Sequence, residues 1–254
     1  MRRTFRVILL SSAFFLSLSL TAFAGELNLQ FTQAKGTNAN GVYTGIYNGN
    51  LGYGTPSGQS TSKFMCDDYF DHISNGEVWQ VQEFNYPNLN SPVHDFTSAS
   101  NFYGGMSESK AYWEALWLAD QVLDHPNIPD PLASIDSFAI WTLLNKNVLS
   151  TLPNCNPNDP HCVTKSEVEI AMGLADAAWH LDGCKHNLEK CTDAVEGVHI
   201  YVPVGWPRGD GRPQEFLSET CPPPSPTPEP MSMVLMGSFL SLAGGLMRRK
   251  KRAS

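Results

Sequence analysis

Cys66 is the side chain of this sequence best suited to chemistry, because two carboxylates and an aromatic ring follow it directly. The segment reads Phe64-Met-Cys-Asp-Asp-Tyr69. A thiolate is a nucleophile, and the same sulfur can form a disulfide or an acyl bond. Cys66 is therefore a candidate reactive thiol. The competing interpretation is a buried or disulfide-paired cysteine that only fills the scaffold.

Two pairs of cysteines lie seven residues apart in the sequence, Cys155 with Cys162 and Cys184 with Cys191. In an oxidising compartment we expect each pair to close a local loop as a disulfide. A zinc site that adds His161 and His186 is the alternative, but the close Cys-x-x-Cys spacing of structural zinc sites is missing. Cys66 and Cys221 remain, and the sequence does not decide whether they pair with each other.

Other chemistry-bearing residues form no convincing constellation. Asp67, Asp68, Asp71 and His72 could chelate a cation, but side chains alternate along a strand and neighbours cannot all converge. The sequence contains 25 Asp and Glu, and no spacing singles out a pair for glycoside hydrolysis. It has no His-Glu-x-x-His and no Gly-x-Ser-x-Gly. We therefore predict no catalytic residues, no metal site and no cofactor.

The elements that would position these residues change type along the chain. Period-two alternation and turn residues predict strands at 27–31, 42–47, 63–70 and 77–84. Helical spacing predicts helices at 107–124, 132–145 and 164–183, the last opened by a Thr164-x-x-Glu167 capping box, and a final short strand at 199–203. The predicted fold class is α+β: one ectodomain over 25–219, with N-terminal strands, about three helices and a short returning strand.

Residues 1–24 have the organisation of a secretory signal peptide. Arg2, Arg3 and Arg6 precede an apolar stretch over 7–20. Ala22 and Ala24 then provide a small-x-small cleavage site before Gly25. We expect the mature chain to begin at Gly25 after export.

The other end of the chain reads in three blocks. Residues 220–230 are a Pro-rich linker, and 231–247 contain no charged residue. Seventeen helical residues span roughly 26 Å, so this segment is a candidate transmembrane helix. The tail 248–254 contains five successive cations, Arg248, Arg249, Lys250, Lys251 and Arg252. Such a cluster stays in the cytoplasm, which would place the ectodomain outside.

Charge is distributed unevenly between the ends and the middle. The whole chain has a formal charge of −8, but residues 25–230 carry 9 Lys and Arg against 25 Asp and Glu, or −16. Nucleic acids and anionic lipids bind basic patches, so this composition argues against both as partners. About two hundred residues can bury a single sizeable core.

The C-terminal pattern resembles the PEP-CTERM sorting signal of exported Gram-negative proteins. The resemblance covers 227–252 and rests on Pro228-Glu229-Pro230, the Gly-rich apolar segment and the terminal cations. It implies recognition by exosortase, a membrane protease-transpeptidase thought to cut near the tripeptide. It further implies release or attachment of the ectodomain at the cell surface. An ordinary C-terminal anchor with a Pro-rich stalk is the alternative.

The ectodomain is similar to a recurring domain of PEP-CTERM proteins and, distantly, to the thioester domains of bacterial surface adhesins. The resemblance rests on Cys66-Asp67-Asp68-Tyr69, on a Gly76-x-x-Trp79 step and on Ala139-Ile140-Trp141. The thioester family joins such a cysteine to a glutamine two residues before Ala-Ile-Trp. That position is Ser137 here, and serine has no carboxamide carbon from which to form the bond.

These observations favour a non-enzymatic exported protein of the cell surface or extracellular matrix. The expected partners are exosortase, signal peptidase and the secretion machinery, the membrane through 231–247, and extracellular polysaccharide or biofilm. The expected location is a transient inner-membrane anchor, followed by the cell surface or the extracellular space. The alternatives are an adhesin that bonds covalently through Cys66 and a secreted carboxylate-dependent hydrolase.

Overall fold

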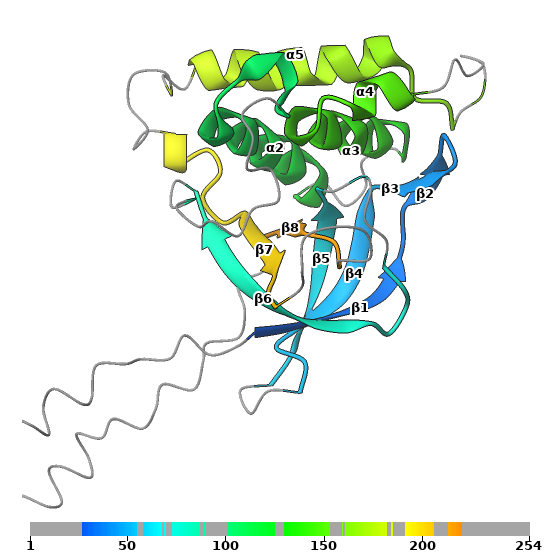
Figure 1. Cartoon of the computed structure of the whole chain (residues 1–254), viewed down its shortest axis with the longest axis vertical. Coiled ribbons are helices and arrows are strands. Elements are labelled where there is room, and N and C mark those ends of the chain that lie inside the picture. The colour runs from blue at the N-terminus through cyan, green and yellow to red at the C-terminus, as the bar shows by residue number, and fades with distance from the viewer. Residues whose placement is uncertain are drawn as a thin grey trace, which may run out of the picture.

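A six-stranded barrel lies beneath two layers of helices (Figure 1). The computed structural model describes residues 27–54, 58–67, 69, 73–86, 89, 101–124, 130–152, 159, 161–181, 184, 191–205 and 213–219. Helices α2 (Glu108–Leu123) and α3 (Asp130–Leu144) pack side by side above the barrel, and α5 (Lys165–Leu181) crosses over both. Two short helices complete this part, η1 (Tyr103–Gly105) and α4 (Val148–Thr151).

The barrel is antiparallel throughout, with the strand order β1-β4-β5-β8-β7-β6. Its strands are β1 (Leu27–Ala34), β4 (Ile46–Leu51), β5 (Ser60–Cys66), β6 (Val78–Asn85), β7 (His199–Pro203) and β8 (Phe216–Ser218). Pairing of β1 with β6 closes the ring. Closure leaves neither end strand with an unpaired edge, which is how barrels avoid edge-to-edge association.

Aromatic side chains fill the barrel interior. The Phe216 ring lies 5.5 Å from Phe64, 5.9 Å from Tyr47 and 6.1 Å from Trp79, measured between ring centroids. Strand β6 shows the alternation that builds such a core, since Trp79 and Val81 are buried and Val78 is exposed. The barrel centre therefore depends on a residue contributed by its shortest strand.

Strands β2 (Thr37–Ala39) and β3 (Val42–Thr44) form a separate two-stranded ribbon beside α3. Asn40 and Gly41 join them with positive φ angles of 51° and 87°, the combination that two-residue hairpin turns require. The Asn40 carboxamide donates to the Val163 carbonyl at 2.8 Å and accepts from the Val163 amide at 3.1 Å. One side chain thus fastens the hairpin to the segment that leads into α5.

Helices α2 and α5 begin where the sequence predicts, and α3 begins two residues before its predicted start at 132. The Ser107 hydroxyl accepts from the Lys110 amide at 3.3 Å and caps α2. Thr164 and Glu167 form the predicted capping box at the start of α5, with the Thr164 amide donating to the Glu167 carboxylate at 2.8 Å and the Glu167 amide donating to the Thr164 hydroxyl at 3.3 Å.

The predicted fold class is wrong in its architecture. We expected an α+β domain in which 199–203 was the last strand and returned to a sheet. The structure instead has a closed barrel, in which β8 lies between β5 and β7 and completes the ring. Strand β5 pairs with β8 across about 150 residues of sequence, with Met65 opposite Leu217. Periodicity locates a strand but does not reveal its distant partner.

The C-terminal transmembrane helix, which was part of the same prediction, is not shown either. Among the described residues, no helix combines the length and apolar character that a membrane span needs. The segment 231–247 lies outside these residues, as do the signal peptide and the basic tail.

Replacing Phe216 with Ala should destabilise the protein by about 3–5 kcal/mol, because the truncation removes three aromatic contacts and leaves a cavity in the barrel centre. The loss should be measured by urea unfolding. Val78→Ala is the control, since Val78 is exposed on the same barrel and should cost less than about 1 kcal/mol. Equal losses in both variants would contradict this account of the core.

Candidate functional site

The fold brings the two sequence patterns around Cys66 and Trp141 into direct contact. Cys66 ends β5, and Trp141 lies on α3. The Trp141 indole Nε1 donates to the Cys66 carbonyl at 2.8 Å. Tyr69 packs against the same ring, with centroids 5.3 Å apart, and against Phe138 at 6.2 Å. The junction of barrel and helices is thus built from the residues that the sequence singled out.

The Cys66 side chain is enclosed in this junction. Its exposed fraction is 1%, and that of Asp67 is also 1%. A reactive thiol must be reached by its target, and reactive cysteines are at least partly exposed. The burial of Cys66 therefore favours a scaffold role for the thiol.

Ser137, the residue at the thioester glutamine position, has a structural role of its own. Its hydroxyl donates to the Ala133 carbonyl at 2.9 Å and accepts from the Gly45 amide at 2.9 Å. Gly45 lies between β3 and β4, so Ser137 ties α3 to the start of the barrel strand. A different glutamine could supply the thioester carboxamide only if it lay beside Cys66, but Gln80 and Gln82 are on the exposed face of β6.

A pocket of about 550 Å³ opens beside this junction, between the barrel strands β1 and β4 and the β2–β3 hairpin. Aromatic and carboxamide side chains dominate its wall. Its described lining residues are Phe31, Gln33, Ala34, Gly41, Val42, Tyr43, Tyr47, Tyr69, Ile73, Asn75, Trp141 and Gln214. None of these described lining residues is an Asp, Glu, Lys, Arg or His. Burial raises the pKa of the Tyr47 phenol above its ordinary value, so Tyr47 keeps its proton. We call this site the aromatic pocket.

The wall of the aromatic pocket is suited to a neutral ligand that carries many hydroxyl groups. Aromatic faces pack against apolar C–H surfaces, and carboxamides both donate and accept hydrogen bonds. Tyr43 is the most accessible of its rings, with 58% of the residue exposed. The Tyr47 hydroxyl donates to the Tyr43 carbonyl at 2.8 Å and holds the hairpin in place. Sequence analysis missed this site because its wall combines segments more than a hundred residues apart.

A second group of polar residues lies between α2 and α5. The Lys110 ammonium lies 2.5 Å from the Asp176 carboxylate and 3.4 Å from that of Glu114. Glu114 is only 1% exposed, and burial raises the pKa of its carboxyl to about 7 despite the opposing effect of Lys110. Asp176 is half exposed, and its hydrogen bond with Lys110 lowers the pKa of that carboxyl.

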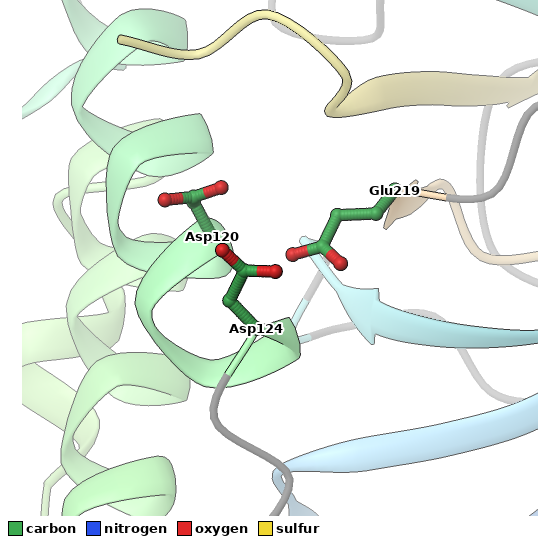
Figure 2. A group of neighbouring side chains, drawn as sticks. All are labelled: Asp120, Asp124 and Glu219. Carbon is green, nitrogen blue, oxygen red and sulfur yellow. The ribbon is translucent and has the colours of Figure 1, made fainter.

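Three further carboxylates converge where α2 ends beside β8 (Figure 2). Asp120, Asp124 and Glu219 each offer an oxygen within 4.8 Å of the others. Such oxygens suit Ca²⁺ or Mg²⁺. The last turn of α2 has no basic residue, so the negative end of the helix dipole adds to their mutual repulsion. An acidic cluster alone does not identify a cation site, and we assign none.

One predicted disulfide is present, and it holds the end of α5 in place. Cys184 and Cys191 are bonded to each other, and both are buried. The Trp113 indole donates to the Cys191 carbonyl at 2.8 Å, which ties this loop to α2. Cys162 is also disulfide-bonded. Cys155, its predicted partner, lies outside the described residues, as does Cys221.

The remaining predicted site residues also lie outside the described residues. They are Ala22, Ala24 and Gly25 of the signal cleavage site, Pro228, Glu229 and Pro230 of the sorting motif, and Arg248, Arg249, Lys250, Lys251 and Arg252 of the basic tail. Their predicted roles stay predictions.

Comparison with known proteins does not place the chain in a family. No protein-family model matches it, and no curated protein or solved structure matches it significantly.

The raised pKa of Glu114 predicts a stability that falls as the pH rises from 5 to 7.5. The folded protein holds this proton up to about pH 7, whereas the unfolded chain releases it near 4.5, so deprotonation costs folding free energy over that window. Glu114→Gln should remove up to about 3 kcal/mol of this decline.

The measurement is the free energy of unfolding at several pH values for both proteins. Asp136 contributes a decline of the same sign, since burial raises its pKa to about 7. Asp136 is present in both proteins, so their difference isolates Glu114. Parallel pH profiles would contradict the assignment.

Proposed function

We propose that this protein is an exported, non-enzymatic component of the cell surface or extracellular matrix that binds a neutral polysaccharide in the aromatic pocket. The observation that carries the proposal is the wall of that pocket, whose described residues provide rings and carboxamides without a charged group. Sugar rings present C–H faces for stacking and hydroxyls for hydrogen bonding. Both kinds of partner meet in this pocket.

A neutral polymer fits better than an acidic one. Residues 25–230 carry 25 acids against 9 cations, so an anionic polysaccharide would be repelled by the protein as a whole. The described lining of the aromatic pocket also offers no Lys or Arg to an acidic sugar. The negative charge of the protein therefore disfavours acidic polysaccharides, and ring stacking and hydrogen bonds provide the affinity for a neutral one.

Export agrees with the cysteine chemistry of the chain. A buried disulfide such as Cys184–Cys191 is typical of proteins that fold in an oxidising compartment. The signal-like residues 1–24 and the Pro228-Glu229-Pro230 pattern supply the route that we propose. That route is export followed by exosortase processing and delivery to the surface or matrix.

The two alternatives receive less support. The covalent adhesin requires an exposed electrophile at Cys66, but Cys66 is enclosed and the Ser137 hydroxyl is engaged in two hydrogen bonds. The hydrolase requires carboxylates at the ligand, and the described wall of the aromatic pocket contributes none. We therefore favour binding over turnover.

Tyr43→Ala should weaken binding of the neutral polysaccharide fraction from the native matrix by about ten-fold, because one stacking ring is worth about 1 kcal/mol or slightly more. The measurement is a titration of the mature protein by calorimetry. Tyr53→Ala is the matched control, since Tyr53 is also exposed but does not line the aromatic pocket. Unchanged affinity in Tyr43→Ala, or an equal loss in both variants, would refute the assignment.

Deletion of 228–254 in the native cell tests the sorting part of the proposal separately. We expect the truncated protein to lose surface delivery and to miss the processing step that shortens the intact chain. Fractionation and the mass of the recovered protein report the result. Delivery and processing identical to those of the intact chain would show that the sorting assignment is wrong, whatever the pocket binds.

A further inference from the structure

The tip of the β2–β3 hairpin is held by a turn that lies far away in the sequence. The Asn40 amide donates to the His161 carbonyl at 3.2 Å. The Asn40 carboxamide donates to the Val163 carbonyl and accepts from the Val163 amide. Asn40 is therefore bonded to both residues that flank Cys162. We call this set of hydrogen bonds the tip clamp.

The turn on the other side of the tip clamp is organised by Asp159 and by the disulfide of Cys162. The Asp159 carboxylate accepts from the His161 amide at 2.9 Å, and the Asp159 carbonyl accepts from the Cys162 amide at 3.0 Å. Cys162 itself is disulfide-bonded, and a crosslink restricts the conformations that a short turn can adopt. The conformation on which the tip clamp depends is thus set in part by the oxidation state of Cys162.

The tip clamp acts on residues that form the wall of the aromatic pocket. The three residues after Asn40 all line it, namely Gly41, Val42 and Tyr43. The base of the hairpin has separate attachments. The Thr44 hydroxyl lies 2.6 Å from the Ser134 hydroxyl of α3, and the Tyr47 hydroxyl of β4 bonds to the last of the three lining residues. Loss of the clamp would therefore free the tip and leave the base attached.

We propose that Asn40 is a positioning residue that couples the disulfide of Cys162 to the aromatic pocket, so that the pocket is fully ordered for its ligand only in the oxidised protein. The inference rests on the function proposed above. A dithiol reductant would transfer two electrons and two protons to the disulfide, giving two cysteine thiols and the cyclic disulfide of the reductant. Binding to the reduced protein would then include the cost of reordering the tip.

Such coupling would make ligand binding depend on the compartment. Cysteines stay reduced in a cytoplasm and form disulfides in an oxidising compartment. The aromatic pocket of an exported protein would therefore reach its full affinity after export, where the proposed polysaccharide is. Inside the producing cell, the reduced chain would bind it more weakly.

The first measurement is hydrogen exchange of the hairpin amides at 37–44 in the mature full-length protein. Asn40→Gly keeps the positive φ of the turn but removes both side-chain bonds of the tip clamp. Cys162→Ala removes the crosslink. Each substitution should speed hairpin exchange by about ten-fold, because the hydrogen bonds that hold the tip are lost or weakened. The amides of β1 and β4 are the internal reference and should keep their rates.

The double variant shows whether the two residues act together. If Cys162 acts through Asn40, the double variant should exchange no faster than the faster single variant. Hairpin exchange that stays unchanged in Cys162→Ala would overturn the proposal. Effects of the two substitutions that simply add would also overturn it, because they would show that the two residues act independently.

The second measurement is the affinity for the neutral polysaccharide fraction, titrated by calorimetry. Asn40→Gly and Cys162→Ala should each weaken binding by about three-fold to ten-fold. Cys184→Ala is the matched control, since it breaks the disulfide at the end of α5 and likewise leaves one unpaired thiol. It should change neither the affinity nor the hairpin exchange, and an equal loss in this control would overturn the proposal.

The two measurements separate this inference from the function on which it rests. If the intact protein binds no neutral polysaccharide, the function proposed above is wrong. The exchange rates do not depend on a ligand, so they still decide whether the tip clamp couples Cys162 to the wall of the aromatic pocket.

Discussion

The barrel of this protein depends on the insertion of β8 between β5 and β7. Cys66 lies opposite Phe216 in one of these pairings, and Tyr201 lies opposite Phe216 in the other. The Phe216 ring then occupies the barrel centre, among Tyr47, Phe64 and Trp79. A strand of three residues thus supplies both the last pairings of the ring and the middle of its core.

The same segment connects the barrel to the helices. Glu215, directly before β8, accepts a hydrogen bond from the buried Tyr112 hydroxyl of α2 at 3.0 Å. On the other side of β5, the Trp141 indole of α3 donates to the Cys66 carbonyl. Two buried hydrogen bonds therefore anchor the helix pair at neighbouring points of the barrel, and such bonds are costly to leave unmade. Trp141, one of these two anchors, also lines the aromatic pocket.

Three parts of the fold build the wall of the aromatic pocket. The pocket joins barrel, hairpin and α3, and its described wall contains no charged residue. An anionic ligand would therefore find no Lys or Arg among these described residues.

Local features of this protein could be predicted from its sequence. Helical spacing and caps located α2 and α5, since a capping box such as Thr164–Glu167 acts within one turn. Seven-residue spacing predicted the Cys184–Cys191 disulfide, which closes a local loop. The pattern around Cys66 and Ala139-Ile140-Trp141 also drew attention to two segments that are in contact. For the caps and the disulfide, the signal lies within a few neighbouring residues.

Only the tertiary structure determined the closed barrel, the aromatic pocket and the burial of Glu114. Strand β8 has three residues, too few to show a period, and its partner Met65 lies about 150 positions earlier. The wall of the aromatic pocket joins Phe31, Tyr43 and Trp141, and nothing in their local sequences indicates that they meet. In the sequence, Glu114 is one acid of an amphipathic helix, and nothing in its neighbourhood indicates that its side chain is buried. Strand pairing, the enclosure of the pocket and the desolvation of Glu114 depend on contacts between distant segments. Residue spacing alone therefore does not predict them.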